Sequence, residues 1–317
     1  MSGFDNQNYN VYSEGFRTLL NLAPQNSVNR LLGTTQYDLH YAEEGDYFNQ
    51  DFLAPSTPQR STSDHAPTPD KETSSMRRVG IFSGFEDSAW IKKSDDVRMA
   101  TTDPTSKYMI SLSNGKERYH ETEILNAYDG PAYEYKVDRS GALISRAPVQ
   151  INWNTAQDVA VDLAVKHEAE TIQASGNQNI TLGKIARTKT MLMKANLGPG
   201  KLYFVIDAEG IEKLQLKIPA SSSDYVAAKT IQETGMGMLF GFMFVMIDQC
   251  NESAPGVRKY FGMHESAMQF AARDIVTARV SERADRKYRA QAYYEAEHGA
   301  ARMIDKAIVR VFADLSR

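Results

Sequence analysis

The stretch DPTSKYMISLSNGKERYHETEILNAYDGP, residues 103–131, carries the strongest helix signals in the chain. Asp103 suits the N-cap and Pro104 the first helical position, because the aspartate side chain accepts a backbone N–H and proline has no N–H to leave unpaired. The closing DGP stops the pattern, which predicts a helix over 104–128, about 36 Å long. Its most apolar face consists of Tyr108, Leu112, Gly115 and Tyr119. This face is only lightly apolar, so we expect the helix to lie across a sheet with much of its circumference polar.

A polar stretch, STPQRSTSDHAPTPDKETSS at 56–75, precedes this helix. From Pro55 to Met76, thirteen of 22 residues are Ser, Thr or Pro, which leaves too little apolar surface to offset the entropy of ordering the segment locally. The flanking sequences QYDLHY and RRVGIFSGFEDSAWI both alternate as strands do. Because neither flank looks like the closed end of a domain, a long hairpin arm explains the stretch better than an interdomain linker. Folded back on itself, such an arm could extend about 35 Å from the body.

The composition indicates a globular protein of one large or two ordinary domains, with 317 residues of which 42% are hydrophobic. A net charge of −4 argues against a protein whose main task is to coat a nucleic-acid backbone, since that task usually requires a basic excess. The single cysteine, Cys250, excludes an intramolecular disulfide framework. No secretory signal is visible, and the longest apolar run, 235–247, has thirteen residues where a membrane-spanning helix needs about 20. We therefore expect a soluble protein that is made in a cytoplasm and has no membrane partner.

The second half of the chain predicts an α/β unit followed by strands. A helical pattern begins at Thr181, LGPG turns the chain, and KLYFVID forms a buried strand that ends at Asp207, before a helix through Leu214. Strands near 273–282 and 287–298 follow, joined by SERADRK, and KAIVRVF closes the chain. Alternate residues of the second of these strands share a face that we expect to be buried: Tyr288, Ala290, Ala292, Tyr294 and Ala296.

Three patterns contain residue types that are common in functional sites, but each is better explained by a role in folding and packing. G-M-G-M-L-F-G at 235–241 is rich in glycine, yet its third glycine comes one place late for a dinucleotide-binding loop, and a strand-like FMFVMI follows instead of a helix. Glu295, Glu297 and His298 offer metal-ligand types, but on a strand His298 faces away from both glutamates. Cys250 has no basic neighbour to lower its pKa. We predict no catalytic residue, no cofactor and no metal.

Two further clusters favour packing over binding. Glu282 and Asp285 interrupt a basic cluster, which indicates a salt-bridged hairpin rather than a phosphate track. The cluster consists of Arg279, Arg283, Arg286, Lys287 and Arg289. Four methionines are expected to fill the core rather than to form an adaptive binding surface. These are Met236, Met238, Met243 and Met246.

Five short motifs, in order along the chain, resemble a known family. They are HAPTP at 65–69, DDVRMATTDPTSKY at 95–108, SDYVAAK at 223–229, LFGFMF at 239–244 and HGAARM at 298–303. Together with the amphipathic start, the polar hairpin, the long capped helix and the α/β unit, they resemble the major capsid proteins of tailed bacteriophages, which have the Hong Kong 97-type fold. The resemblance extends over nearly the whole chain.

The resemblance implies an α+β fold with an N-terminal arm, an extended β-hairpin loop, a long spine helix in a peripheral domain and an α/β axial domain. The implied divisions are 1–35 for the arm, 36–100 for the extended loop, 101–180 for the peripheral domain with its spine helix at 104–128, 181–275 for the axial domain and 276–317 for C-terminal strands that return to the peripheral domain. Residues expected to contact neighbouring subunits are Arg60, Asp64, His65, Arg77 and Arg78 on the loop, and Tyr12 and Phe16 on the arm.

The implied function is a structural, non-enzymatic one. Copies of the chain would form pentamers and hexamers in the icosahedral shell of a virion, enclosing double-stranded DNA without sequence preference. The implied partners are a separate scaffolding protein, a portal protein and a decoration protein, with assembly in the host bacterial cytoplasm. Two alternatives stay open at this point: an encapsulin-type compartment with the same fold, and a soluble nucleotide-binding enzyme built on the α/β unit.

Overall fold

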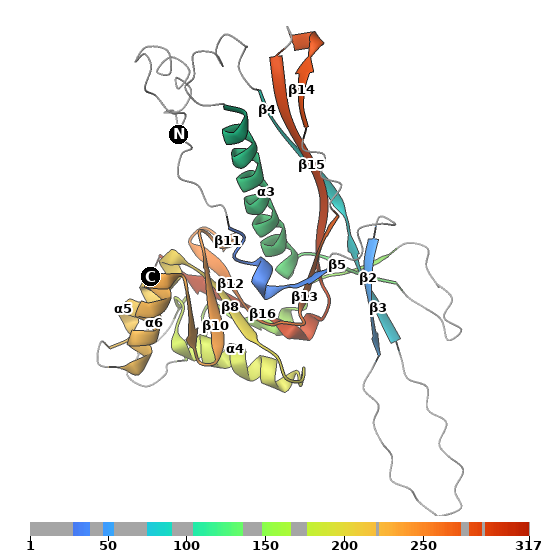
Figure 1. Ribbon diagram of the computed structural model, residues 1–317. Helices are drawn as coiled ribbons and strands as arrows, with labels where there is room; N and C mark the ends of the chain where they lie inside the picture. Colours follow the sequence, from blue (N-terminus) through green and yellow to red (C-terminus); the bar gives the residue numbers. More distant parts are fainter. Residues whose placement is uncertain are drawn as a thin grey trace, which may run out of the picture.

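The computed structural model describes residues 28–38, 47–53, 75–90, 104–135, 148–165, 176–219, 222–273, 279–286 and 289–316. Within these ranges the chain forms three β-sheets and a small number of helices (Figure 1). The longest helix runs beside the longest strand. The α/β part lies at one end of this pair, and a two-stranded hairpin projects away from the same end.

The helices are α3 (Pro104–Asp129), α4 (Leu182–Lys194), α5 (Ala208–Lys217) and α6 (Ser223–Thr234), with 3-10 turns η1 (Leu32–Thr34), η3 (Thr155–Gln157), η4 (Ala284–Arg286) and η5 (Asp305–Ala307). The strands in the first half are β1 (Gln36–Asp38), β2 (Tyr47–Leu53), β3 (Ser75–Ile81), β4 (Ser83–Trp90), β5 (Ala132–Tyr135), β6 (Val149–Ile151) and β7 (Asp158–Val159). Those in the second half are β8 (Leu202–Asp207), β9 (Met236–Leu239), β10 (Phe242–Ile247), β11 (Glu252–Ala254), β12 (Val257–His264), β13 (Met268–Arg273), β14 (Arg279–Arg283), β15 (Arg289–Arg302) and β16 (Ile308–Asp314).

The predicted long helix is confirmed as α3, which begins at Pro104 and ends one residue later than predicted. It lies along a five-stranded sheet in the order β1-β13-β15-β14, with β4 also paired to β15. The predicted burial pattern of β15 is confirmed where its side chains are described, because Ala292, Tyr294 and Ala296 are buried. They face α3 together with His298 and with Phe85 of β4.

The α/β unit is a seven-stranded sheet in the order β7-β16-β12-β8-β10-β9, with β11 paired to β12. The expected strand ending at Asp207 is β8, and the Asp207 carboxylate accepts the Gly210 backbone N–H at 2.8 Å, which begins α5. Helix α4 packs against β12 and β16, where Gly262 lets Thr188 approach the sheet closely. The C-terminal turn of α3 packs on the other side, with Tyr128 against Phe261. The main hydrophobic core therefore joins α3 to the seven-stranded sheet.

The hairpin belongs to a third sheet, in the order β2-β3-β5-β6. The strand before the polar stretch is β2, with sequence YFNQDFL, and not the predicted QYDLHY. Within QYDLHY, Gln36–Asp38 forms β1, which pairs in parallel with β13. The prediction overlooked β2 because Asn49, Gln50 and Asp51 hide its alternation. The tip, residues 54–74, lies outside the described residues.

Two predicted strands differ in their boundaries from those of the structure. Of the strand predicted near 273–282, Arg273 is the end of β13 and 279–282 belong to β14, while residues 274–278 lie outside the described residues. Both are antiparallel to β15, which has fourteen residues and accommodates them one after the other along the same edge. The last strand runs over 308–314, later than KAIVRVF, because a 3-10 turn occupies 305–307.

The glycine-methionine run forms the hairpin of β9 and β10, so its interpretation as strand is confirmed. Phe240 and Gly241 both have positive φ, 52° and 77°, as a tight two-residue turn between twisted strands requires. The prediction of core methionines is wrong for Met236 and Met238, which are 49% and 67% exposed. Gly237, between them, faces Ile231 of α6, so the two methionines lie on the opposite face of the strand, which points away from this helix.

Among the described residues, the helices are too short or too polar for any of them to cross a membrane.

Candidate functional site

Arg77 lies at the base of the hairpin, on β3, directly opposite Asp51 of β2. Its guanidinium forms a two-pronged contact with the carboxylate, with Nε to Oδ1 at 2.6 Å and Nη2 to Oδ2 at 2.8 Å. These hydrogen bonds hold the pKa of Asp51 below its usual value. Both side chains are largely exposed, so the pair contributes only about 0–1 kcal/mol to the subunit. It aligns the two strands and leaves its outer side open to another molecule.

Arg78 points the opposite way and is buried, with 4% exposure. Its Nη2 donates to Oδ2 of Asp305, in the turn between β15 and β16. Arg302, at the end of β15, donates from Nε to the other oxygen of the same carboxylate at 2.6 Å. Asp305 thus joins the hairpin sheet to the five-stranded sheet.

Arg302 also caps the spine helix. Its Nη1 donates to the carbonyl oxygens of Tyr128 at 3.2 Å and Gly130 at 2.8 Å, at the C-terminal end of α3. These carbonyls lack partners inside the helix and carry the negative end of its dipole, so a buried cation stabilises them. The guanidinium also lies over the ring of Trp153, 5.1 Å from its centroid.

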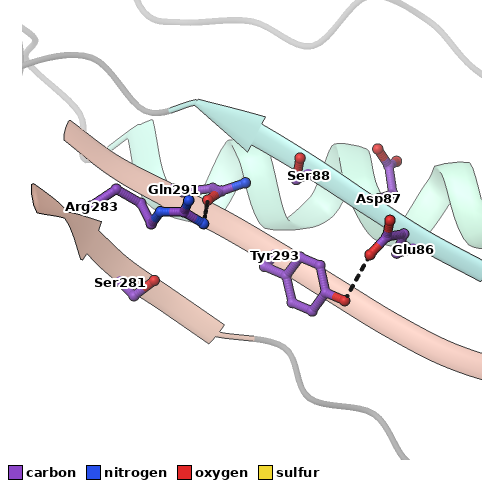
Figure 2. Close-up of a pocket in the computed structure, with 7 residues that line it drawn as sticks. All are labelled: Glu86, Asp87, Ser88, Ser281, Arg283, Gln291 and Tyr293. Atoms are coloured by element: carbon purple, nitrogen blue, oxygen red, sulfur yellow. Dashed lines mark hydrogen bonds between the residues drawn. The ribbon is translucent and has the colours of Figure 1, made fainter. Parts of the chain in front are cut away.

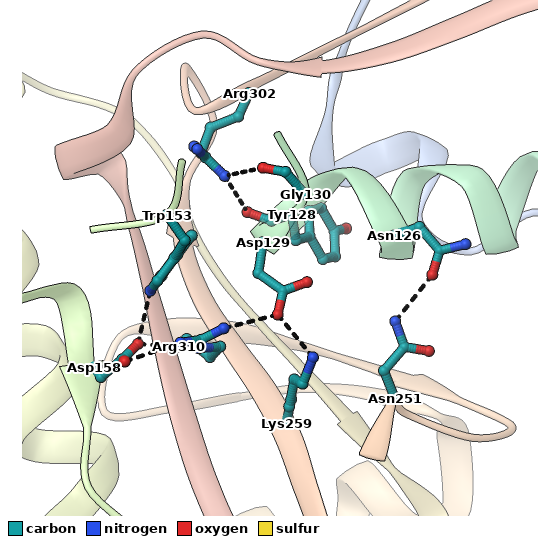
Figure 3. Close-up of polar contacts among 10 residues, drawn as sticks. All are labelled: Asn126, Tyr128, Asp129, Gly130, Trp153, Asp158, Asn251, Lys259, Arg302 and Arg310. Carbon is teal, nitrogen blue, oxygen red and sulfur yellow. Dashed lines mark hydrogen bonds and ion pairs between the residues drawn. The ribbon is translucent and has the colours of Figure 1, made fainter. Parts of the chain in front are cut away.

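Asp129, the last residue of α3, continues the contacts into the seven-stranded sheet (Figure 3). Its Oδ2 lies 2.9 Å from Lys259 of β12 and 2.9 Å from Arg310 of β16. Arg310 also forms a two-pronged contact with Asp158, at 3.0 and 2.9 Å, and Asp158 accepts the indole N–H of Trp153 at 2.8 Å. Burial opposes the charge on Arg310, but the hydrogen bonds that it donates to Asp158 and Asp129 raise its pKa.

We call these residues the junction network: Arg78, Asp129, Trp153, Asp158, Lys259, Arg302, Asp305 and Arg310. The four cations outnumber the three carboxylates, and the α3 carbonyls supply the remaining negative potential. Removing one partner of a buried pair typically costs about 3–5 kcal/mol. The network connects all three sheets to the spine helix, so it fixes their relative orientation. Each charged side chain of the network has at least one oppositely charged partner within it, which supports a structural role.

The other predicted contact residues cannot be placed. Tyr12, Phe16, Arg60, Asp64 and His65 lie outside the described residues, and so does the predicted N-cap Asp103. For Arg77 and Arg78 the structure gives partners inside the same chain. Arg77 keeps an exposed side, whereas Arg78 is enclosed, so Arg77 is the better placed of the two to reach a neighbour.

The predicted salt-bridged hairpin at 279–289 has its expected pairs in the described part: Arg283 lies 2.9 Å from Asp285, and Arg286 lies 4.0 Å from it. Nearby, a pocket of about 600 Å³ opens on the side of β4, β14 and β15 that faces away from α3 (Figure 2). Across this face the Tyr293 hydroxyl lies 3.1 Å from Glu86 and from Glu295. Partial desolvation and hydrogen bonds to these carboxylates raise the pKa of Tyr293 to about 12.

Cys250 is buried, and burial raises the pKa of its thiol well above the usual value, which disfavours the reactive thiolate. His298 faces aromatic rings on the side opposite Glu295 and Glu297, as predicted. Among the described residues, no three His, Cys, Asp or Glu side chains are grouped closely enough to hold a metal ion.

Sequence reasoning missed most of the junction network. Two signals were available. If the alternation of the strand is continued to Arg302 within HGAARM, it places this arginine on the buried face, and Asp129 directly follows the predicted helix. Neither identifies its partner, because Arg302 and Tyr128 are 174 residues apart in sequence.

Comparison with known proteins agrees with the fold. A sequence model described as "Phage capsid protein" matches residues 9–314. The structure is similar to the capsid of Ralstonia phage GP4, with a TM-score of 0.69, 10% identity and 96% of each chain covered. It is also similar to the capsid asymmetric unit of cyanophage Pam1, with a TM-score of 0.65, 10% identity and 100% of each chain covered. The head structure of Helicobacter pylori bacteriophage KHP40 gives 0.63, 10% and 95% of each chain.

No individual curated protein matches the sequence significantly. The structural likenesses, at 10% identity, establish the fold, which is of the Hong Kong 97 type as the motifs implied. The family match goes further because it covers the hairpin, the spine helix and the α/β unit together. The chain therefore belongs to the phage capsid protein family.

Proposed function

We propose that this chain is the subunit that closes into the icosahedral head shell of a tailed phage and encloses its double-stranded DNA. Its structural role in a phage capsid follows from family membership. The observation that supports the finer proposal is coverage: the similarity to phage capsids extends over at least 95% of this chain in the three comparisons above. An enzyme that shared only one domain with capsid proteins would be similar to them over only part of its length.

The proposed mechanism is mechanical containment. Many copies make heterologous contacts that are individually weak, and closure of the shell makes them cooperative. Within each subunit, the junction network keeps the hairpin, spine helix and seven-stranded sheet in fixed relation while the shell is under load. A slightly acidic subunit suits this task, because an inner wall that bound phosphates tightly would hinder DNA packing and release.

We propose the following division of the subunit: an N-terminal arm at 1–35, an extended loop at 36–100, a peripheral domain at 101–180 with C-terminal strands β14 and β15, and an axial domain at 181–275 whose sheet also contains β16. The loop would lie on a neighbouring subunit, so that assembly buries a surface that folding leaves open. The composition of 56–75 supports this assignment.

The proposed contact residues are Arg60, Asp64, His65, Arg77 and Arg78 on the loop and Tyr12 and Phe16 on the arm. Arg77 is favoured over Arg78 because its pair with Asp51 is exposed. In the axial domain, edge strand β9 with its exposed Met236 and Met238 supplies a further candidate contact. Pairing of a neighbour with this edge would cover two apolar side chains that folding does not.

The proposed partners are further copies of the chain, a separate scaffolding protein, a portal protein and a decoration protein, with assembly in the host bacterial cytoplasm before DNA is packaged. Phage capsid membership supports the virion as the final location.

Electron microscopy of the expressed protein, alone and with a scaffolding protein, tests the proposal. We expect closed shells of uniform size. Enzymes copurifying inside such shells in place of DNA would favour the encapsulin-type alternative. A stable monomer of 35.5 kDa whose melting temperature rises with nucleotide would overturn the proposal and support a nucleotide-binding enzyme.

A further inference from the structure

Two buried histidines meet where the spine helix crosses the long strand. His120 of α3 is 5% exposed and His298 of β15 is 0% exposed. Their ring centroids lie 4.7 Å apart, at an interplanar angle of 49°. The contact therefore lies within the packing between α3 and the five-stranded sheet.

Aromatic rings from three other positions surround the pair. Phe85 of β4 lies 5.9 Å from His120 and 5.1 Å from His298, and Phe270 of β13 lies 5.1 and 6.0 Å from them. Tyr119 of α3 contacts His298 at 5.1 Å. Among the described residues, Nε2 of His120 and both ring nitrogens of His298 are buried without a hydrogen-bond partner. A proton added to one of these three nitrogens would therefore have no acceptor within hydrogen-bond distance.

The charged groups around the cluster do not supply such an acceptor. Lys116, one turn before His120, lies 5.8 Å over the Tyr294 ring and adds positive potential. Glu123 is engaged with the Tyr119 hydroxyl, and Asp87 of β4 faces α3 nearer to Gly115. Phe270 is the contact from β13 and carries no charge. Burial first, then His298 and Lys116, lower the pKa of His120 to about 3, and burial with Lys116 lowers that of His298 to about 4.

We propose that the His120–His298 contact is an acid-sensitive latch that holds the N-terminal half of the spine helix on the long sheet. It is closed while both rings are neutral, and protonation of either ring opens it by placing a cation among apolar rings. The C-terminal half of α3 stays in place, because Ile124, Leu125 and Tyr128 belong to the main core and Arg302 caps the helix end.

The direction of the pH effect follows from linkage. An exposed histidine has a pKa of about 6.5, so the open form takes up protons below that pH while the closed form does not until pH 4 or lower. Stability of the closed contact is fully present above pH 6.5 and is lost as pH falls toward the folded-state values. Each histidine favours the open form by up to about tenfold per pH unit in this window.

Hydrogen exchange of the unassembled full-length subunit tests the latch, with labelling carried out at each pH from 7 to 4 and each measured rate divided by the intrinsic exchange rate at that pH. We expect protection of residues 110–120 to fall by about a hundredfold or more between pH 6.5 and 4.5. Residues 122–129 and α5 should keep their protection. Simultaneous loss in all three segments would mean global unfolding and would overturn the proposal.

A double variant, His120→Phe with His298→Phe, keeps aromatic rings in an aromatic cluster and removes both protonation sites. It should hold residues 110–120 protected to a pH at least one unit lower than the unmodified chain does. His264→Asn is the matched control. His264 is also buried, but it lies at the end of β12 in the seven-stranded sheet, and its Nδ1 is paired with the Ser266 hydroxyl at 2.8 Å. Identical pH profiles for the unmodified chain and the double variant would overturn the proposal.

A measurement on the unmodified chain keeps the proposal testable if the double variant does not fold. The chain has six histidines, whose ring carbons can be labelled and followed by NMR as pH falls. We expect two resonances that do not titrate near pH 6.5 and that change together with the exchange of residues 110–120. Ordinary titration of either His120 or His298 near 6.5 would contradict the latch.

Discussion

Lys184, in the first turn of α4, is fully buried and yet hydrogen-bonded three times. Its ammonium donates to the backbone oxygens of Val161 at 3.0 Å, Gln178 at 3.0 Å and Phe312 at 2.7 Å. Burial lowers its pKa to about 7, whereas these three acceptors favour the charged form. One side chain thus ties two loops and β16 to α4.

Lys184→Met should therefore destabilise the subunit strongly, because methionine fills a similar length but removes three hydrogen bonds from a charged donor. The oxygens of Val161 and Gln178 would each keep one backbone donor, the N–H groups of Gln178 and Asp314. We expect a loss of roughly 3 kcal/mol or more in the free energy of unfolding. Lys189→Met is the matched control on the same helix, since Lys189 donates to one carbonyl, that of Phe240, at 2.8 Å, and should cost roughly 1 kcal/mol. Urea unfolding followed by circular dichroism measures both, and equal losses would show that the three acceptors are not what stabilises the site.

For individual residues, the sequence predicted which of them do not form a metal site better than it predicted which residues contact one another. The alternation of side chains along a strand correctly predicted that His298 points away from Glu295 and Glu297, because this alternation depends only on neighbouring residues. The sequence does not show that Lys184 and Arg302 are buried, since each has an acceptor more than a hundred residues away, the carbonyl oxygens of Phe312 and Tyr128. Lysine and arginine are usually exposed, and long-range backbone acceptors reverse that tendency here.

At the scale of elements, the sequence contains start and stop signals for helix α6 that our prediction did not use. Ser222 accepts the Asp224 backbone N–H at 3.2 Å as N-cap, Ala228 and Ile231 are buried at helical spacing, and Gly235 ends the helix with a left-handed φ of 76°. Serine before the helix and glycine after it are local signals that sequence alone contains. The short length and the exposed Val226 weaken the apolar pattern, so α6 was absent from the predicted elements.

Gly235→Ala tests the stop signal of α6. A Cβ at this position has room, with Met246 the nearest atom at 3.9 Å, so the cost comes from the left-handed backbone alone. We expect a loss of about 1–2 kcal/mol in the free energy of unfolding. Gly33→Ala is the control, because no atom lies within 4 Å and no left-handed φ is required there, and it should be close to neutral. A neutral Gly235→Ala would mean that α6 does not end at this residue.

At the scale of the whole molecule, local signals located the spine helix, β8 and the polar hairpin stretch, and family motifs supplied the fold that joins them. Which strands pair with one another could not be predicted from the sequence. Strand β15 pairs with β4, β13 and β14, which come from segments up to about two hundred residues apart, and no periodicity encodes that choice. The same holds for the junction network, whose partners meet only after the three sheets have formed.

Assembly should weaken with salt if charged loop residues contact neighbours. The candidate charges are Arg60, Asp64, Arg77, Arg78 and the cluster at 279–289. Exposed pairs contribute about 0–1 kcal/mol each, but a shell repeats them in every subunit, and salt screens them over about 10 Å at 0.1 M. We expect the yield of closed shells, counted by electron microscopy, to fall as salt is raised before maturation. A yield unchanged up to molar salt would remove electrostatics from the account of assembly.

Shortening the hairpin separates folding from assembly. Replacing residues 56–74 with a short Gly-Ser turn should leave the body folded, because β2 and β3 are in register from Tyr47 opposite Ile81 to Leu53 opposite Ser75 and can be closed by a turn. Closed particles should become rare, since every subunit loses the surface proposed to lie on its neighbour.

The matched control for this variant replaces the same residues with a Gly-Ser chain of equal length, which keeps the span and removes the side chains. If loop side chains make the contact, both variants should fail to form shells, whereas rescue by the control would mean that only length matters. Circular dichroism of the soluble subunit and electron microscopy of the assembly products are compared with the unmodified chain. Normal particles from the shortened chain would show that the stretch is a linker, and an unfolded subunit would show that it belongs to the core; either result contradicts an arm that is buried by assembly.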